Sequence, residues 1–130
     1  MSLNNPLADA LVHIMNCERI AKSECIIKPS SKIIKDVLNL LKKEKYVGDF
    51  EVINQGSYEI LKLNLLNKIN KIGIIRPYFS VKKDDFEKFE KRYLPSKELG
   101  FLIVSTSKGL MTNIEAKQKK LGGRLIAYVY

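Results

Sequence analysis

The sequence has few of the residues on which metal sites usually depend. It contains two cysteines, Cys17 and Cys25, and a single histidine, His13. His13 and Cys17 are four residues apart and could share a helix face, but two ligands do not complete a four-coordinate structural zinc site. Both cysteines stand in apolar contexts, which favours reduced core residues. We therefore predict no metal site and no other cofactor.

Motifs for nucleotide binding and for catalysis are also missing. The chain has neither GxxxxGKS nor GxGxxG, so no nucleotide cofactor or small-molecule substrate is indicated. A nucleophilic serine needs a base within reach, and the one histidine lies far along the chain from the serine-rich segment. We predict a protein without enzymatic activity and without catalytic residues.

Long apolar runs are absent as well. No stretch approaches the roughly 18 apolar residues that a membrane span requires, and the N-terminal "MSLNNPLADAL" lacks a basic segment followed by an apolar signal core. We expect a cytoplasmic protein without membrane contact. With 130 residues, 45% of them apolar, and only four prolines, the chain can build one ordinary core or two small subdomains.

Acidic residues are scarce relative to basic ones. The 23 Lys and Arg against 14 Asp and Glu give a net charge of +9, which makes a polyanion, nucleic acid first, the leading class of partner. The excess is uneven, because residues 60–83 contain no acid and residues 101–130 contain Glu115 alone. Such bias indicates a basic face, although solvated lysines that keep a protein soluble give the same pattern.

Apolar spacing predicts helices and strands in the first part of the chain. "NNPLADALVHIMNCERI" is typical of a helix with Asn5 as N-cap and Pro6 at the first turn. "ECIIK" is a strand candidate, and "PSSKIIKDVLNLLKKEKYVG" predicts a helix capped by Ser30 or Ser31. "DFEVINQGSYEILKLNLL" alternates as two strands around a turn, and "KIGIIRPYF" adds a third that ends at a proline.

The remaining segments indicate an α+β protein with two small subdomains. Residues 1–80 would form N-terminal helices packed on a three-stranded sheet, and the charged segment 81–98 a linker with a short helix. Residues 99–130 would form a mainly antiparallel β subdomain with a short helix, since "FLIV" and "RLIAYVY" flank "NIEAKQKK". We assign RNA binding to this last subdomain.

A cluster of hydroxyl side chains follows "FLIV". Thr112 and Glu115 fit a helix capping box, which gives those two a structural role. Residues 105–108, Ser-Thr-Ser-Lys, then have no obvious local role, although a turn stabilised by hydroxyls remains an alternative. Short hydroxyls can donate to phosphate and ribose oxygens without bulk, which suits the shallow minor groove of folded RNA.

Three further groups are candidate contacts with an anionic backbone. Gly122 and Gly123 could cradle a phosphate or allow two chain segments to approach closely. The stretch from Lys28 to Lys32 sets two cations around two serines at a helix start, where an N-cap and anion binding are both compatible. Tyr78 beside Arg76 offers a stacking surface for an unpaired base.

The C-terminal run "STSKGLMTNIEAKQKKLGGRLIAYVY" resembles the small-subunit ribosomal protein eight family, whose pattern joins STS, a basic residue, G-[VL]-M-T and a later GG. "NPLADALVHIMN" and "PSSK" are similar to that family too. The chain departs from the bacterial pattern at Asn5, at Tyr78, where a glycine is usual, and at Arg124, where an acid is usual. These departures resemble the archaeal or eukaryotic-type branch.

The resemblance implies a two-domain α+β protein that binds a central-domain helix of small-subunit rRNA during assembly, with neighbouring ribosomal proteins as further partners. It also implies that the protein could repress its own mRNA. The RNA contacts implied by the family fall on Ser105, Thr106, Ser107, Lys108 and Gly109, with Gly122 and Gly123 in support, and on Lys28, Ser30, Ser31 and Lys32. The alternative is a module for another structured RNA or an acidic partner.

Overall fold

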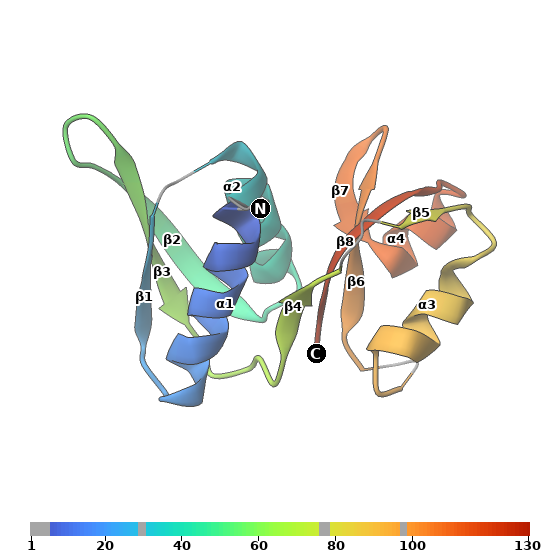
Figure 1. The fold of residues 1–130 in the computed structure, drawn as a ribbon, viewed down its shortest axis with the longest axis horizontal. Helices are drawn as coiled ribbons and strands as arrows, with labels where there is room; N and C mark the ends of the chain where they lie inside the picture. Colours follow the sequence, from blue (N-terminus) through green and yellow to red (C-terminus); the bar gives the residue numbers. More distant parts are fainter. Residues whose placement is uncertain (1–5, 29–30, 76–78, 97–98) are drawn as a thin grey trace. The chain divides into compact units, whose positions relative to one another are not determined.

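The computed structural model describes residues 6–28, 31–75, 79–96 and 99–130, and the chain divides into two compact units, residues 1–70 and 71–130. The first unit contains two helices and a three-stranded antiparallel sheet (Figure 1). Its elements are α1 (Pro6–Arg19), β1 (Glu24–Ile27), α2 (Lys32–Lys43), β2 (Val47–Asn54) and β3 (Glu59–Leu65). The sheet order is β1-β3-β2, with α1 packed near β1 and α2 near β2.

Helix α2 illustrates why this unit forms. Its start is fixed by Ser31, whose Oγ accepts a hydrogen bond from the Ile34 N–H at 3.4 Å. Apolar residues recur at helical spacing and are fully buried, among them Val37 and Leu41. Lys42 and Lys43 occupy the last turn, where positive charge complements the helix dipole. The helix was predicted with Ser30 or Ser31 as its cap; the structure confirms the helix and has Ser31 as the cap.

The second unit is built around a five-stranded antiparallel sheet. Strand β8 is central, because β4 and β5 both pair with it and β6 pairs on its other side. Helix α3 adds Phe86 and Phe89 to a buried cluster that includes Leu102 and Leu125. The elements are β4 (Ile72–Ile74), β5 (Ser80–Val81), α3 (Phe86–Tyr93), β6 (Phe101–Thr106), β7 (Gly109–Thr112), α4 (Asn113–Gln118) and β8 (Gly123–Val129).

The α+β class and the three-stranded N-terminal sheet are confirmed, but one strand belongs elsewhere. Strand β4, expected with the first subdomain, pairs with β8 through Ile74 and Ala127. The chain therefore divides after Asn70, whereas the sequence placed the boundary at residue 80. Part of the segment 81–98, expected as a linker, supplies buried residues of the second core. No helix within the described ranges has both the length and the apolar character to span a membrane.

Candidate nucleic-acid interface

The serine-rich segment forms a β-hairpin rather than a loop between a strand and a helix. Strands β6 and β7 pair in register, with Ser105 opposite Leu110 and Thr106 opposite Gly109. Two residues, Ser107 and Lys108, remain at the tip of the hairpin, and both are exposed. The hairpin thus holds a hydroxyl and a cation in solvent at the end of a paired ladder.

Thr106 has the local role that the sequence left open as an alternative, a turn stabilised by a hydroxyl. Its Oγ1 donates to the carbonyl oxygen of Gly109 at 2.9 Å and accepts from the Lys108 N–H at 3.1 Å. Because a threonine hydroxyl carries one proton, the bond to Gly109 uses its donor. Thr106 closes the turn, and Gly109 completes it at φ +109°, a conformation that favours glycine.

A cavity of about 640 Å³ lies beside the hairpin in the same unit. Arg124 of β8 stands opposite Ser80 of β5 on one side and opposite Ser105 of β6 on the other. Directly opposed residues of an antiparallel sheet project on the same face, so the Arg124 side chain shares its face with the side chains of Ser80 and Ser105. The cavity is lined by Ser80, Val81, Lys82, Asp85, Ser105, Gly123 and Arg124.

Gly122 and Gly123 allow the close packing of chain segments at this cavity. A Cβ atom at Gly123 would lie 2.2 Å from the carbonyl oxygen of Ser105, and one at Gly122 would lie 2.5 Å from that of Val81. Both distances are far below van der Waals contact, so any side chain would push the strands apart. Of the two roles that the sequence allowed for these glycines, the structure supports close approach.

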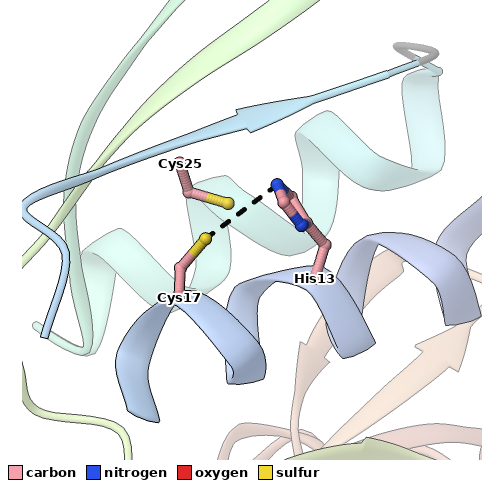
Figure 2. Close-up of side chains that lie close together, drawn as sticks. All are labelled: His13, Cys17 and Cys25. Atoms are coloured by element: carbon pink, nitrogen blue, oxygen red, sulfur yellow. Dashed lines mark hydrogen bonds between the residues drawn. The ribbon is translucent and has the colours of Figure 1, made fainter. Parts of the chain in front are cut away.

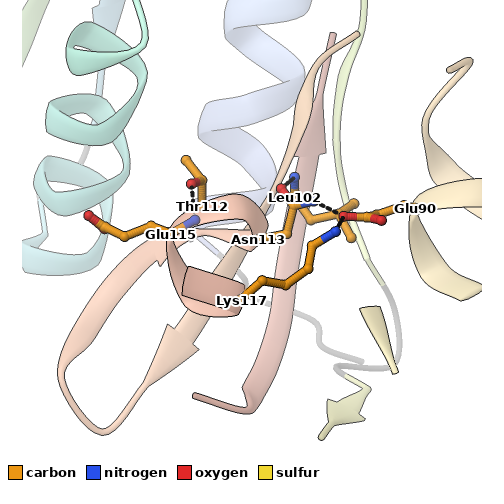
Figure 3. A network of polar contacts seen from close by, with 6 residues as sticks. All are labelled: Glu90, Leu102, Thr112, Asn113, Glu115 and Lys117. Carbon is orange, nitrogen blue, oxygen red and sulfur yellow. Dashed lines mark hydrogen bonds and ion pairs between the residues drawn. The ribbon is translucent and has the colours of Figure 1, made fainter. Parts of the chain in front are cut away.

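A buried polar network supports the base of the hairpin (Figure 3). Asn113, the first residue after β7, accepts a bond from the Leu102 N–H at 2.9 Å through Oδ1 and donates from Nδ2 to Glu90 Oε2. The ammonium group of Lys117 lies 2.6 Å from the same Glu90 oxygen. Helix α3 is thereby joined to β6 and α4.

The short helix α4 begins as the sequence predicted. The Glu115 N–H donates to Thr112 Oγ1 at 3.1 Å, which forms the first half of the capping box (Figure 3). The extended backbone of Thr112, at φ −76° and ψ 160°, is typical of an N-cap. Thr112 therefore ends the β7 strand and starts the helix in one residue.

The N-terminal candidates lie in the first unit. Lys28 follows β1 and is exposed, with its Nζ 5.8 Å from the ring centroid of Tyr58. Ser31 caps α2, and Lys32 is the exposed first residue of that helix. Ser31 thus has a structural role compatible with a contact to an anion. Ser30, Arg76 and Tyr78 lie outside the described residues.

Sequence reasoning did not propose five of the lining residues as contacts: Ser80, Val81, Lys82, Asp85 and Arg124. Ser80 and Lys82 belong to a segment that looked like a boundary, and Arg124 was noted as a departure from a family pattern. Pairing of β5 with β8 brings them beside Ser105. No local signal could have found them, because a two-residue strand has no recognisable periodicity.

The arrangement suits a phosphate-rich ligand. Two cations, Lys82 and Arg124, meet two serine hydroxyls in one concave surface, with Asp85 as the one acid among the lining residues. Arginine forms bidentate bonds with phosphate, and serine can donate to phosphate or ribose oxygens. A comparison with known families finds that the family model described as Ribosomal protein S8 matches residues 5–130.

Proposed function

The chain belongs to the ribosomal protein S8 family, and from this premise we propose that the cavity and the adjoining hairpin tip form its main rRNA-binding surface. The family comprises structural proteins of the small ribosomal subunit that bind rRNA, and it is not a family of enzymes. The chain is accordingly a small-subunit ribosomal protein that acts in translation.

The observation that carries the proposal is the position of Arg124 between two serines in the cavity beside the hairpin. Lys82 adds a second cation, and Ser107 and Lys108 extend the polar surface into solvent at the tip. The cations attract the RNA backbone whatever its base sequence, while the hydroxyls, which need hydrogen-bond partners at defined positions, favour one local shape of the RNA.

Within this proposal, the residues have unequal roles. The RNA is contacted by three residues of the hairpin, Ser105, Ser107 and Lys108, and by two cations of the cavity, Lys82 and Arg124. Thr106, Gly109, Gly122 and Gly123 hold the surface in shape, since their hydrogen bonds and close contacts already serve the fold.

We further propose that a central-domain helix of small-subunit rRNA is the site bound, with backbone contacts from Lys28, Ser31 and Lys32. The same proposal has four further parts. The protein represses its own mRNA, contacts neighbouring ribosomal proteins, is located in the cytoplasm and belongs to the archaeal or eukaryotic-type branch. The family resemblance and the departures at Asn5, Tyr78 and Arg124 support it.

A binding experiment with matched variants tests the surface. Ser107→Ala should weaken binding to a folded central-domain rRNA fragment by about 1–3 kcal/mol, because a desolvated hydrogen bond is lost. Ser57→Ala, at an exposed position in the β2–β3 turn of the first unit, is the control and should bind as the parent does. Equal affinity of the two variants would show that the hairpin tip makes no contact.

The cations are tested by the dependence of affinity on salt. Lys82→Ala should lower affinity for all RNAs and reduce the slope of log K against log salt by about one. Lys83→Ala removes the same charge from the next residue, which does not line the cavity. If Lys83→Ala has the larger effect, the cavity is not the docking surface. Tighter binding of an unrelated structured RNA would instead favour a different RNA partner.

A further inference from the structure

His13, Cys17 and Cys25 converge in the first unit, where helix α1 packs against strand β1 (Figure 2). One imidazole nitrogen of His13 and the two cysteine sulfurs lie within 4.8 Å of one another. His13 Nε2 lies 3.9 Å from Cys17 Sγ. Among the described residues, this is the one cluster of three side chains that could ligate a metal.

The fold brings these side chains together by two simple periodicities. His13 and Cys17 are four residues apart on α1 and therefore share a face of the helix. Cys25 and Ile27 are the inward residues of β1, whose burial alternates, and α1 packs against this strand. Cys25 is 1% exposed and Cys17 is 4% exposed, so both sulfurs are enclosed by the protein.

We propose that His13, Cys17 and Cys25 bind one zinc ion, with the fourth coordination position open to solvent. Two thiolates and an imidazole are the ligands that zinc prefers. A tetrahedral site with zinc–sulfur bonds of about 2.3 Å holds its ligand atoms about 3.8 Å apart. The observed spread requires side-chain movements of about 1 Å or less, which rotamer adjustment supplies without a change of fold.

The open position is consistent with the surroundings of His13. The His13 side chain is exposed and lines a cavity of about 500 Å³ together with Asp9 and Lys28. A water molecule or another small ligand can therefore reach the ion from this side. Three protein ligands and one exchangeable position are an arrangement that zinc sites commonly adopt.

Coordination has a defined charge balance. Both cysteines give up their protons to solvent, and two thiolates then neutralise the two positive charges of the ion. Without the ion, burial and then the adjacent Cys17 thiol raise the pKa of Cys25 to about 12, so this side chain is a neutral thiol. The bound ion would join α1 to β1 and stabilise the first unit.

Cobalt substitution gives the most direct test. Reduced, metal-free full-length protein is titrated with Co²⁺ and then with Zn²⁺. We expect a sulfur-to-cobalt charge-transfer band and tetrahedral d–d bands that saturate at one ion per chain and disappear when Zn²⁺ is added. Zn²⁺ should also raise the melting temperature of the parent protein.

Three variants assign the ligands. His13→Gln should weaken zinc binding by at least about tenfold, while Cys17→Ser and Cys25→Ser should each abolish the charge-transfer band or halve its intensity. Asn16→Ala, also exposed on α1, is the control and should bind as the parent does. His13 is exposed, so its variant should fold and give a result even if the cysteine variants do not.

Either of two results would overturn the proposal. One is the absence of a cobalt charge-transfer band and of a zinc-induced thermal shift in the reduced parent protein. The other is undiminished binding by His13→Gln, which would place the ion elsewhere. Because no RNA is present in these measurements, their outcome is independent of the proposed rRNA-binding surface.

Discussion

Replacement of Asn113 by alanine should strongly destabilise the second unit. The Asn113 side chain is 2% exposed and makes two hydrogen bonds, one from the Leu102 N–H at 2.9 Å and one to Glu90. Alanine would leave a buried N–H without an acceptor, at a cost of about 1–3 kcal/mol. It would also remove a charge-assisted bond to a buried carboxylate, which contributes about 1.5–3 kcal/mol.

Together these losses predict a decrease of about 2.5–6 kcal/mol in the free energy of unfolding. For a chain of 130 residues, 3 kcal/mol corresponds to a fall of about 10 °C in melting temperature. Urea denaturation followed by circular dichroism measures the free energy, and hydrogen exchange measures the protection of the Leu102 amide. Asn39→Ala, at an exposed position in α2, is the control and should change stability by less than about 0.5 kcal/mol.

A double-mutant cycle tests whether the network acts as a unit. Asn113→Asp keeps an acceptor for the Leu102 N–H but places a second carboxylate against Glu90. Adding Glu90→Gln restores the hydrogen bond in the opposite direction, because the new amide at position 90 can donate to the new carboxylate at position 113. The double variant should therefore recover at least half of the stability lost in Asn113→Asp. Additive effects of the two changes, or a cost of Asn113→Ala no larger than that of Asn39→Ala, would refute the reasoning.

Two other substitutions test the packing and the electrostatics. Gly123→Ala should lower stability by about 2 kcal/mol or more, because its Cβ would lie 2.2 Å from the Ser105 carbonyl oxygen. The control for thermal unfolding is Gly48→Ala, because Gly48, like Gly123, has no positive φ and its new Cβ would approach other atoms only to 3.2 Å, so the difference between the two variants measures the clash. Glu18→Gln should stabilise the protein at neutral pH by about 1–3 kcal/mol, since Glu18 is 6% exposed and the nearby backbone amides compensate the buried charge only in part. Burial raises the pKa of Glu18 above its ordinary 4.5, while the nearby backbone amides of Ile69 and then Asn67 oppose that shift. The folded state then binds more protons between 4.5 and the raised pKa, so parent stability falls with rising pH in that window and the advantage of Glu18→Gln disappears in acid; an advantage independent of pH would contradict this account.

Local signals in the sequence were sufficient to predict features that depend only on residues within one helix or next to it. The Ser31 cap, the apolar spacing of α2 and the Thr112 cap of α4 all depend on residues within a few positions, and the structure confirms them. The family resemblance also came from contiguous motifs, and the match over residues 5–130 confirms it. The RNA-binding roles of the individual residues stay predictions.

Features that depend on distant pairing were beyond the sequence. Strand β4 has apolar residues at alternate positions, as the neighbouring strands do. Nothing in its three residues specifies β8 as its partner rather than β3. Ser80, Ser105 and Arg124 could not be predicted to lie together for the same reason, because they meet only through the pairing of β5 and β6 with β8.

The sequence by itself determined the class of the protein: a basic, folded α+β chain whose motifs place it in a ribosomal family. The tertiary structure alone decided which side chains meet, as Cys25 shows when β1 carries it beside His13 and Cys17. The physical reason is that helix caps and apolar periodicity act over a few residues, whereas strand pairing and packing join residues whose separation along the chain leaves no local pattern.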